Sequence, residues 1–484
     1  MSDILIIGGG VSGLSAGIYA LRNGHKATIC EKHFLTGGNL TAWNRRGFTV
    51  DTCIHWLTGT NKNTGMYKMW EDLGVLNDSI MIKKPECLFT VEHDGESLSL
   101  YRDFERTYQR MLELSPTDKK EIDSFRKCVD AMHGVVGTFG PEKNKLFSWY
   151  HYVPYIPVLF KYYTHSTKEI ADRFKHPLLK LFMNSLMGYD FNAVDFAFVV
   201  ATFTGDNADI PDGLSKPMAE RMTEKFISLG GTLLTGKEAE KINVNNGIAE
   251  SVDFKDGSNI KADYILLCMD PITASRSLLD TKLPKKLNKQ INNTDYKYFS
   301  SYHVEFTVDT DNVPFTESLF IEVPEDKKEA VGNRRIIVRD FTSEPGFSKE
   351  GKRNLQAMIY CNGDRIKEFL EAYDKGKEEY LEFKQKKVDA VMSVIEERFP
   401  EYKGKINILD AWTPATYRRF TGAHMGTFQS FINPKWKAPI PVKNRLSKVK
   451  NVILASQWQM SPGGLPAAAS AGRRAIKAID GYLK

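Results

Sequence analysis

The sequence predicts an α/β fold: a parallel sheet built from three separate parts of the chain, joined to an α+β region with a mixed or antiparallel sheet. Three observations predict it. A short apolar strand, a glycine-rich turn and a helix follow one another from residue 4 onward. Strand and helix patterns of the same kind return at residues 210–270 and 451–482. Between these parts, residues 302–361 contain alternating and apolar runs that are typical of strands in an antiparallel sheet.

The N-terminal segment has the order of a Rossmann-like dinucleotide-binding unit. Residues 4–7 form a continuous apolar run, as a buried parallel strand requires, and residues 12–23 have the pattern of a helix. Gly8, Gly10 and Gly13 have the fingerprint spacing at this junction. They permit a tight turn, the approach of backbone amides to a pyrophosphate, and close packing of helix on strand. The helix N-terminus adds positive potential toward the same phosphates.

Glu31 narrows the choice of dinucleotide. It follows the second predicted strand, residues 27–30, about 20 residues after the glycines. A carboxylate at this position accepts hydrogen bonds from the 2′-hydroxyl of an adenosine ribose and would repel a 2′-phosphate, which disfavours NADP. These residues alone leave FAD and NAD open.

Two later segments complete the predicted parallel-sheet domain. The first has an amphipathic helix at residues 217–229, stopped by two glycines, and then short strands that end in a buried strand at residues 262–268. The second has a strand at residues 451–456, a loop with two adjacent glycines, and an alanine-rich helix at residues 466–482. Both patterns are typical of a nucleotide-binding fold.

We therefore expect three regions along the chain. The discontinuous cofactor domain comprises residues 1–75, 206–285 and 425–484. A mainly helical substrate or lid region comprises residues 76–205, and a substrate-binding region of sheet and helix comprises residues 286–424. A charged pattern at residues 365–399 predicts one long scaffold helix within the last of these.

Composition indicates an ordinary soluble enzyme. The 484 residues are 42% hydrophobic and carry a net charge of +6, which is too diffuse to predict nucleic-acid binding. The six cysteines have no paired metal-ligand spacing, so we expect no metal site. No apolar run reaches the roughly 18 residues of a membrane span, and the pattern that begins at residue 4 leaves no room for a signal peptide. We expect a cytoplasmic protein; the oligomeric state stays open.

With its three segments assembled, the chain resembles the phytoene desaturase, carotenoid isomerase and retinol saturase family of FAD-dependent oxidoreductases, among the amine oxidase-like flavoproteins. The resemblance runs essentially end to end, and Asp51-Thr-Cys-Ile-His55 is most like the retinol saturase branch. It implies FAD, a bulky lipophilic substrate with C=C bonds, hydride transfer at flavin N5, and frequent association with a membrane surface. The motifs that carry it, in the family's order, are the N-terminal glycines, Glu31, Gly37-Gly38, residues 47–56, Leu229-Gly-Gly231 and residues 461–467.

The expected cofactor-binding residues come from all three segments. Backbone amides near Gly464 and Leu465, with the dipole of the last helix, would face the flavin edge where a reduced ring gathers negative charge. Gln457 would hydrogen-bond the ribityl chain as an amide. The full set is Gly8, Gly10, Val11, Ser12, Gly13, Glu31, Lys32, Gly37, Gly38, Asn39, Ala239, Gln457, Gly464 and Leu465.

Two departures from the family pattern concern the cofactor. Asn39 stands where many relatives carry an arginine that contacts the pyrophosphate, and Arg45 or Arg46 is a candidate to replace it. The element before the middle helix lacks its second glycine, because Leu214 follows Gly213. Local backbone geometry is therefore expected to differ there.

Four residues are candidates for catalysis. His55 is the first, since its place in the saturase-like stretch suggests the flavin cavity and an imidazole can move a proton near neutral pH. Tyr417, Arg419 and His424 form a second polar cluster just before the last cofactor segment. For each of the four, a hydrogen-bonding role in the cavity wall is the alternative.

Two surface features suggest a lipid-facing region. Eight aromatics crowd residues 147–163, interrupted by two prolines, and a mobile lid, a membrane contact and an aromatic core all remain open for them. Six basic residues without an acid lie within residues 435–450, where a membrane contact or a solvated loop would each fit. A membrane surface is thus a candidate partner beside the lipophilic small-molecule substrate.

The predicted function is an FAD-dependent desaturase, saturase or flavin-assisted isomerase of a lipophilic polyene, terpenoid or fatty-acid-like molecule. A flavin amine oxidase is the first alternative, with Trp56 and Trp458 as candidates for an aromatic cage. A non-catalytic flavin- or lipid-binding protein is the second. The direction of reaction and the substrate are left open by the sequence.

Overall fold

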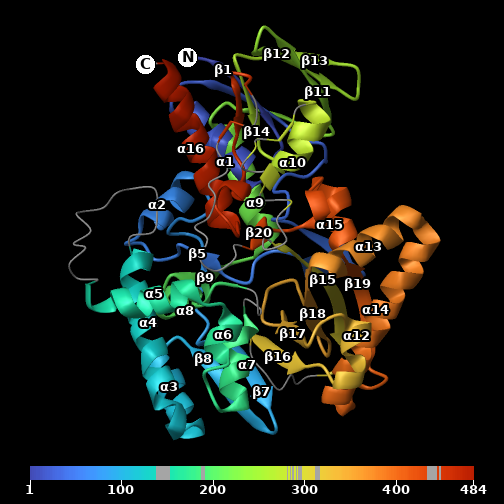
Figure 1. Ribbon diagram of the computed structural model, residues 1–484. Coiled ribbons are helices and arrows are strands. Elements are labelled where there is room, and N and C mark those ends of the chain that lie inside the picture. Colours follow the sequence, from blue (N-terminus) through green and yellow to red (C-terminus); the bar gives the residue numbers. More distant parts are fainter. Residues whose placement is uncertain are drawn as a thin grey trace.

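The molecule contains two large sheets, one wholly parallel and one mixed, which confirms the predicted fold class (Figure 1). The parallel sheet lies in the upper part of Figure 1 and the mixed sheet in the lower part, with a set of helices on either side of the latter. The computed structural model describes residues 1–137, 153–186, 191–280, 282–283, 285, 288–289, 292, 297–310, 317–432, 444–445 and 448–483.

The parallel sheet draws its five strands from three distant parts of the chain. Each neighbouring pair is parallel, and residues 4–7 are buried because helices and loops cover both faces. The strands in spatial order are β10 (Thr232–Leu234), β2 (Lys26–Cys30), β1 (Asp3–Ile7), β14 (Tyr264–Leu267) and β21 (Val452–Leu454).

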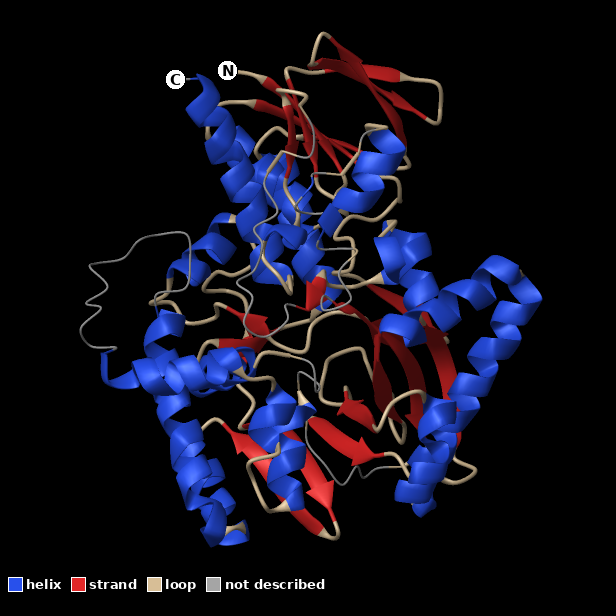
Figure 2. Cartoon of the chain, viewed as in Figure 1, coloured by secondary structure: helices blue, strands red, loops and turns tan. Residues whose placement is uncertain are grey.

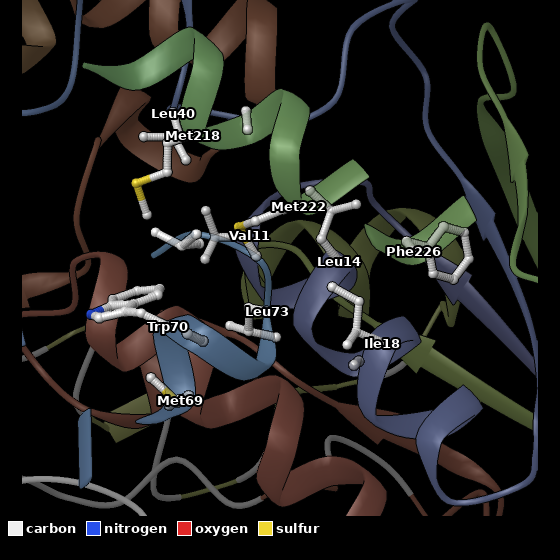
Figure 3. Close-up of a cluster of buried hydrophobic side chains, with 14 of the residues drawn as sticks. Val11, Leu14, Ile18, Leu40, Met69, Trp70, Leu73, Met218, Met222 and Phe226 are labelled. Atoms are coloured by element: carbon white, nitrogen blue, oxygen red, sulfur yellow. The ribbon is translucent and has the colours of Figure 1, made fainter. Parts of the chain in front are cut away.

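Helix α1 (Val11–Arg22) is the centre of the packing beside this sheet. Its apolar residues Val11, Leu14 and Ile18 recur at helical spacing and face side chains from α2 and α9 (Figure 3). The helices that contact or surround it are α2 (Gly65–Asp72), α9 (Ser215–Ser228) and α16 (Leu465–Leu483).

A glycine allows α1 to begin directly beneath the first strand. A Cβ atom added to Gly13 would lie 1.9 Å from the carbonyl oxygen of Gly8. That distance is far inside van der Waals contact, so only glycine fits. The third glycine of the fingerprint therefore serves helix–strand packing, as the sequence predicts.

The mixed sheet has eight strands, all antiparallel to their neighbours except for the parallel pair of β16 and β7. Strands β7 and β8 come from the region that the sequence predicts to be mainly helical, so regions 76–205 and 286–424 share one sheet. The order is β19 (Ile406–Trp412), β15 (Lys297–Val308), β18 (Arg353–Asn362), β17 (Arg335–Asp340), β16 (Ser318–Glu322), β7 (Cys87–His93) and β8 (Glu96–Tyr101), with β20 (Phe431–Ile432) paired to β15.

Helices cover the two faces of the mixed sheet (Figure 2). Alternate residues divide between the faces: Ile337 and Met358 pack with one helical group, and Val338 and Ala357 with the other. The first group is α3 (Phe104–Leu114), α4 (Lys119–Gly137), α5 (Ile156–Thr164), α6 (Thr167–Ala171), α7 (Pro177–Ser185) and α8 (Ala193–Thr204). The second is α12 (Lys328–Val331), α13 (Gly363–Lys375), α14 (Lys377–Arg398) and α15 (Pro414–Thr421).

The prediction of one long helix over residues 365–399 is wrong. The chain forms α13 and α14, which are separated at Gly376, whose φ is 141°. A helix cannot continue through that backbone conformation, and glycine tolerates it without a steric penalty. Charged residues continue on both sides of Gly376 because α13 and α14 each have an exposed face.

Three small sheets lie outside the two large ones in the described part of the chain. The pair β3 (Ala42–Arg45) and β4 (Phe48–Asp51) leads the chain toward His55. The other small sheets are β5 (Leu57–Thr58), β9 (Ala208–Pro211) and β6 (Ile82–Lys83), and the antiparallel β11 (Ala239–Asn245), β12 (Ile248–Phe254) and β13 (Asn259–Lys261).

In the described ranges, no helix is both long and apolar enough to cross a membrane. Helix α10 (Pro271–Thr273) follows the fourth strand of the parallel sheet.

The two lipid-facing candidates lie partly outside the described residues. Phe147, Trp149, Tyr150 and Tyr152 of the aromatic stretch are not described, nor are Lys435, Lys437 and Lys443 of the basic stretch. In the remainder of the aromatic stretch, Tyr162 is fully buried, whereas Phe160 is 60% exposed. Of the basic residues that are described, Lys448 and Lys450 are exposed.

Candidate active site

One cavity of about 750 Å³ runs from the carboxyl ends of the parallel strands to the mixed sheet. Ile7, Cys30 and Cys268, which end or follow β1, β2 and β14, line one part of it. Open α/β sheets bind ligands at this edge of the strands. The volume is in the range of about 300–1,000 Å³ that is usual for small-molecule and cofactor sites.

The structure brings the predicted cofactor-binding residues together around this cavity. Gly13 is the exception, because it packs beneath Gly8 and contributes space for the turn. The residues that line the cavity are Gly8, Gly10, Val11, Ser12, Glu31, Lys32, Gly37, Gly38, Asn39, Ala239, Gln457, Gly464 and Leu465.

The carboxylate of Glu31 is fixed by the backbone around it. Its Oε2 atom accepts a hydrogen bond from the Gly9 N–H at 2.7 Å, and its Oε1 atom accepts one from the His33 N–H at 2.9 Å. An ionised carboxylate has about four lone-pair sites, so capacity remains for two hydroxyl donors. Glu31 is thus oriented at the cavity wall, where a ribose could meet it.

Gln457 organises the C-terminal loop instead of offering a free amide. Its Nε2 atom donates to the Phe428 carbonyl at 3.1 Å, and its Oε1 atom accepts the Gly464 N–H at 2.8 Å. The predicted contacts of the Gln457 amide with the ribityl chain and of the Gly464 N–H with the flavin stay predictions, and in this structure the Gly464 N–H is bonded to Gln457. The N-terminal end of α16, at Leu465, remains at the cavity wall.

The position left by the missing arginine is not filled by Arg45 or Arg46. Arg45 forms an ion pair with Asp410 at 2.7 Å, and neither arginine lines the cavity. Arg45 is the last residue of β3, Arg46 lies in the turn to β4, and both are exposed. Asn39 itself lines the cavity and donates to the Phe428 carbonyl at 3.1 Å.

His55 lies in the cavity wall, at the end of a turn that Asp51 holds. Asp51 is 1% exposed and accepts hydrogen bonds from the Cys53 N–H at 3.0 Å and from the Ser215 hydroxyl at 2.7 Å. Burial, together with the positive charge of Arg339, holds the pKa of His55 well below its usual range. The imidazole is therefore neutral near pH 7.

Tyr417 also lines the cavity and belongs to a buried network centred on His303. The Ser301 hydroxyl lies 2.8 Å from Nε2 of His303, and the Tyr417 hydroxyl lies 3.3 Å from the same atom. Nδ1 of His303 lies 3.1 Å from the Oε1 atom of Gln356. An amide oxygen only accepts, so Nδ1 carries the proton, and Nε2, with its single lone pair, accepts from one of the two hydroxyls.

Burial keeps His303 neutral, and stacking on Trp412 fixes the plane of its ring. Its ring stacks on Trp412 with centroids 4.5 Å apart, and burial lowers its pKa to about 3. The indole N–H of Trp412 donates to the Tyr417 oxygen at 3.0 Å, which leaves the phenol proton directed to His303 or to the cavity. His303 was not among the predicted site residues, although a histidine and a glutamate two residues apart on an apolar strand were a visible signal.

Arg419 and His424 are not in the cavity lining, so the structure gives no support to their prediction as catalytic residues. Residues on α15 turn by about 100° each, so Arg419 lies about 200° from Tyr417 and is exposed. The backbone N–H of His424 donates to Asp270 at 2.5 Å, and its ring packs edge-on against Tyr298. Neither side chain lines the cavity.

The half of the cavity next to the mixed sheet is apolar. Its lining includes Leu88, Phe89, Phe191, Phe198, Val199, Phe299, Phe320, Ile337, Met358, Tyr360 and Phe428. Asp195, in the first turn of α8, is one of the few ionisable residues in this half, and burial raises its pKa to about 6. Among the described residues, no group of three His, Cys, Asp or Glu side chains is placed to hold a metal ion.

Arg339, on β17, is a second charged residue in the wall. It is 7% exposed, donates from Nη2 to the Ile54 carbonyl at 2.9 Å, and lies 4.5 Å from the ring centre of Phe341. Its strand was predicted from the sequence, but Arg339 was not among the predicted site residues. An arginine at the end of an apolar run carries no signal that it faces a cavity.

Comparisons with known proteins agree with this architecture. A 4,4'-diaponeurosporene oxygenase from Staphylococcus haemolyticus is 22% identical over 90% of this chain and 88% of its own length. An all-trans-retinol 13,14-reductase from Danio rerio is 20% identical over 91% and 81%, respectively. The crystal structure of an oxidoreductase from Methanosarcina mazei superimposes with a TM-score of 0.65 at 16% identity, covering 98% of this chain and 100% of that one. Residues 11–479 match the family model described as flavin-containing amine oxidoreductase, and the chain belongs to this family.

Proposed function

We propose that the protein is an FAD-dependent oxidoreductase that acts on C–C or C=C bonds of a lipophilic polyene, terpenoid or fatty-acid-like substrate. The observation that carries the proposal is the single cavity with two different halves. One half is lined by the glycine-rich turn, Glu31 and the start of α16, and the other by aromatic and aliphatic side chains of the mixed sheet and α8. Distant relatives named for carotenoid and retinol chemistry support the same class of substrate.

The residues present fit FAD. Gly10, at the N-terminus of α1, lines the cavity beside Gly37 and Gly38, whose backbone a Cβ atom on Gly10 would contact at 3.9 Å, and the pyrophosphate would bind at these glycines. Glu31 would hold the adenosine ribose, and the start of α16 would face the flavin ring. When bound, FAD would supply hydride transfer at N5.

The chain's own residues would position the substrate and handle its proton. Burial raises the pKa of Tyr417, so its hydroxyl stays protonated and can donate. The indole N–H of Trp412 holds the phenol oxygen, and the phenol proton is directed either to Nε2 of His303 or, when Ser301 occupies that nitrogen, to the cavity. Neutral His55 provides a second donor or acceptor, and the apolar lining excludes water.

A flavin amine oxidase is the second candidate, and Asp195 favours it. The carboxylate of Asp195 lines the cavity, and no hydrogen bond or ion pair of its side chain is formed within the described ranges, so a cationic amine could pair with it. The buried guanidinium of Arg339 opposes this candidate, because a like charge in a poorly solvated cavity repels an ammonium group. The two candidates therefore differ in the charge of the preferred substrate.

Anaerobic mixing separates the two candidates. FAD-loaded protein, followed at the flavin band near roughly 450 nm, is expected to bleach with saturated or partly desaturated lipids, or to reoxidise from its reduced form with C=C acceptors. Bleaching by amines alone would contradict the proposal. A protein that takes up no FAD at all would exclude both candidates.

The same assay tests the two proton-handling residues. Tyr417→Phe and His55→Ala are expected to retain the flavin spectrum and to slow the chemical step by about 10²- to 10⁴-fold, the usual contribution of a positioned acid or base. Full turnover in either variant would remove that residue from the mechanism. Arg419→Gln, whose side chain is exposed on the same helix as Tyr417, is the control and should turn over normally.

A further inference from the structure

Arg339 carries more hydrogen-bonding capacity than the protein uses. A guanidinium has five N–H donors, and in the described ranges one of its nitrogens, Nη2, is hydrogen-bonded, to the carbonyl of Ile54 at 2.9 Å. Arg339 is only 7% exposed, and it lines the cavity. A buried charge with open donors facing a cavity is the arrangement that a ligand acceptor completes.

The carboxylates nearest to Arg339 are engaged elsewhere. Asp51 is bound by Ser215 and by the backbone of its own turn. Glu317 and Glu344 both pair with Lys83, at 3.0 and 3.4 Å. Among the described residues, no carboxylate oxygen lies within 4.0 Å of the Arg339 nitrogens, the limit for an ion pair.

Glu305 does not neutralise Arg339 either. Its Oε2 atom accepts the Gln356 amide at 3.0 Å, and burial raises its pKa well above the usual range, so it stays protonated. The guanidinium is thus a positive charge without a contacting counter-ion, in a wall whose other residues are mostly apolar.

We propose that the substrate carries an anionic oxygen head group, a carboxylate, which binds the guanidinium of Arg339 while its hydrocarbon part lies along the apolar half of the cavity. The inference rests on the proposed function in taking this cavity as the substrate site. Ile337 and Arg339 lie on the same face of β17, two residues apart, so the strand itself joins the head-group position to the apolar lining. The substrate class is a lipophilic carboxylic acid.

A purely structural role is the competing explanation. Arg339 bonds the carbonyl of Ile54, next to His55, and packs on Phe341, so its loss could simply disturb that turn. A structural role needs only the one N–H that bonds Ile54. It would give an acid and an alcohol of equal chain length the same affinity for the protein. Head-group preference therefore separates the two explanations.

Calorimetric titration of the flavin-loaded protein with laurate and with 1-dodecanol measures that preference. Wild-type protein is expected to bind laurate at least tenfold more tightly, because a hydrogen bond to a charged group contributes about 1.5–3 kcal/mol. In Arg339→Gln the ratio should fall to about one, and Arg339→Lys should restore part of it.

Arg335→Gln is the matched control. Arg335 lies four residues earlier on the same face of β17, is also buried, and bonds the Leu181 carbonyl instead of lining the cavity. This variant should keep the preference for laurate. Equal binding of both probes by wild-type protein, no binding of either, or a laurate preference that survives in Arg339→Gln would each overturn the inference.

These outcomes are independent of the proposed reaction. If neutral lipids turn over and laurate shows no preference, the anionic head group is excluded while the oxidoreductase function stands. If laurate binds through Arg339 and no lipid turns over, the binding site stands and the redox function fails.

Discussion

Buried ionisable residues in this cavity lower the stability of the folded protein near neutral pH. Asp195 shows this most clearly, since its carboxylate faces the cavity without a partner in the described part of the chain. Burial alone raises its pKa to about 6, from an ordinary value near 3.8. A partly buried carboxylate without a partner disfavours the ionised form of the folded protein.

The raised pKa of Asp195 predicts that the free energy of unfolding decreases as the pH rises. Between about pH 4 and pH 6 the unfolded chain has already lost the proton that the folded protein retains, so stability falls as pH rises through this window. Asp195→Asn should reduce the loss of unfolding free energy between pH 4.5 and 7.5 by about 1–2 kcal/mol. Urea unfolding at the two pH values measures it.

Asp172→Asn, at an exposed carboxylate that pairs with Lys168, is the control and should leave the profile of the wild type unchanged. A variant at Asp195 with the wild-type pH profile would show that cavity water solvates the carboxylate fully. Loss of amine binding in the same variant, with lipid turnover intact, would assign the carboxylate to a secondary ligand.

Elements were easier to predict than the direction in which their side chains point. The helix at residues 217–229 and the strands of the mixed sheet have local signals, so α9, β15, β17 and β18 were expected close to their places. The break at Gly376 was missed because a glycine in a charged helix has no periodic signature. Tyr417 and Arg419 were grouped by sequence, although two helical residues in this relation face opposite directions.

The contact between α1 and α16 offers an element-scale test. A Cβ atom on Gly472 would lie 2.5 Å from the carbonyl oxygen of Ser12, so Gly472→Ala must push α16 away from α1. We expect a loss of about 1–3 kcal/mol of unfolding free energy and weaker FAD binding, because both helices begin at the cavity. Thermal unfolding and flavin titration measure the two effects.

Gly481→Ala is the matched control on the same helix. A Cβ atom there meets nothing within 4 Å, so the substitution should raise helix stability by up to about 1 kcal/mol and leave FAD binding unchanged. If the two alanine variants behave alike, the close approach of α16 to α1 is not needed for the fold or for the cofactor.

At the scale of the whole molecule, the sequence predicted which segments meet but not the shape of the space between them. Strands β1, β14 and β21 each have a local apolar signal, and the rules for parallel sheets place them side by side. The joining of β7 to β16 depends on long-range pairing that no local pattern encodes. For the same reason, the sequence did not predict that His303 and Arg339 line the cavity. Each lies on a strand of the mixed sheet, and the residues across the cavity from it are far away in sequence.

Because three distant segments build the cofactor half of the cavity, FAD should stabilise the entire fold. A ligand that binds the folded state alone, at about 100 times its Kd, adds about 2.7 kcal/mol to the unfolding free energy. FMN should add little, because the turn at Gly8 and Gly10 and the carboxylate of Glu31 are positioned for the adenosine half that FMN lacks. Differential scanning calorimetry of apoprotein with excess FAD, excess FMN or neither tests this. Equal stabilisation by FMN would show that the glycine-rich turn does not hold a dinucleotide, while stabilisation by FAD that Glu31→Ala abolishes would assign the adenosine end to Glu31.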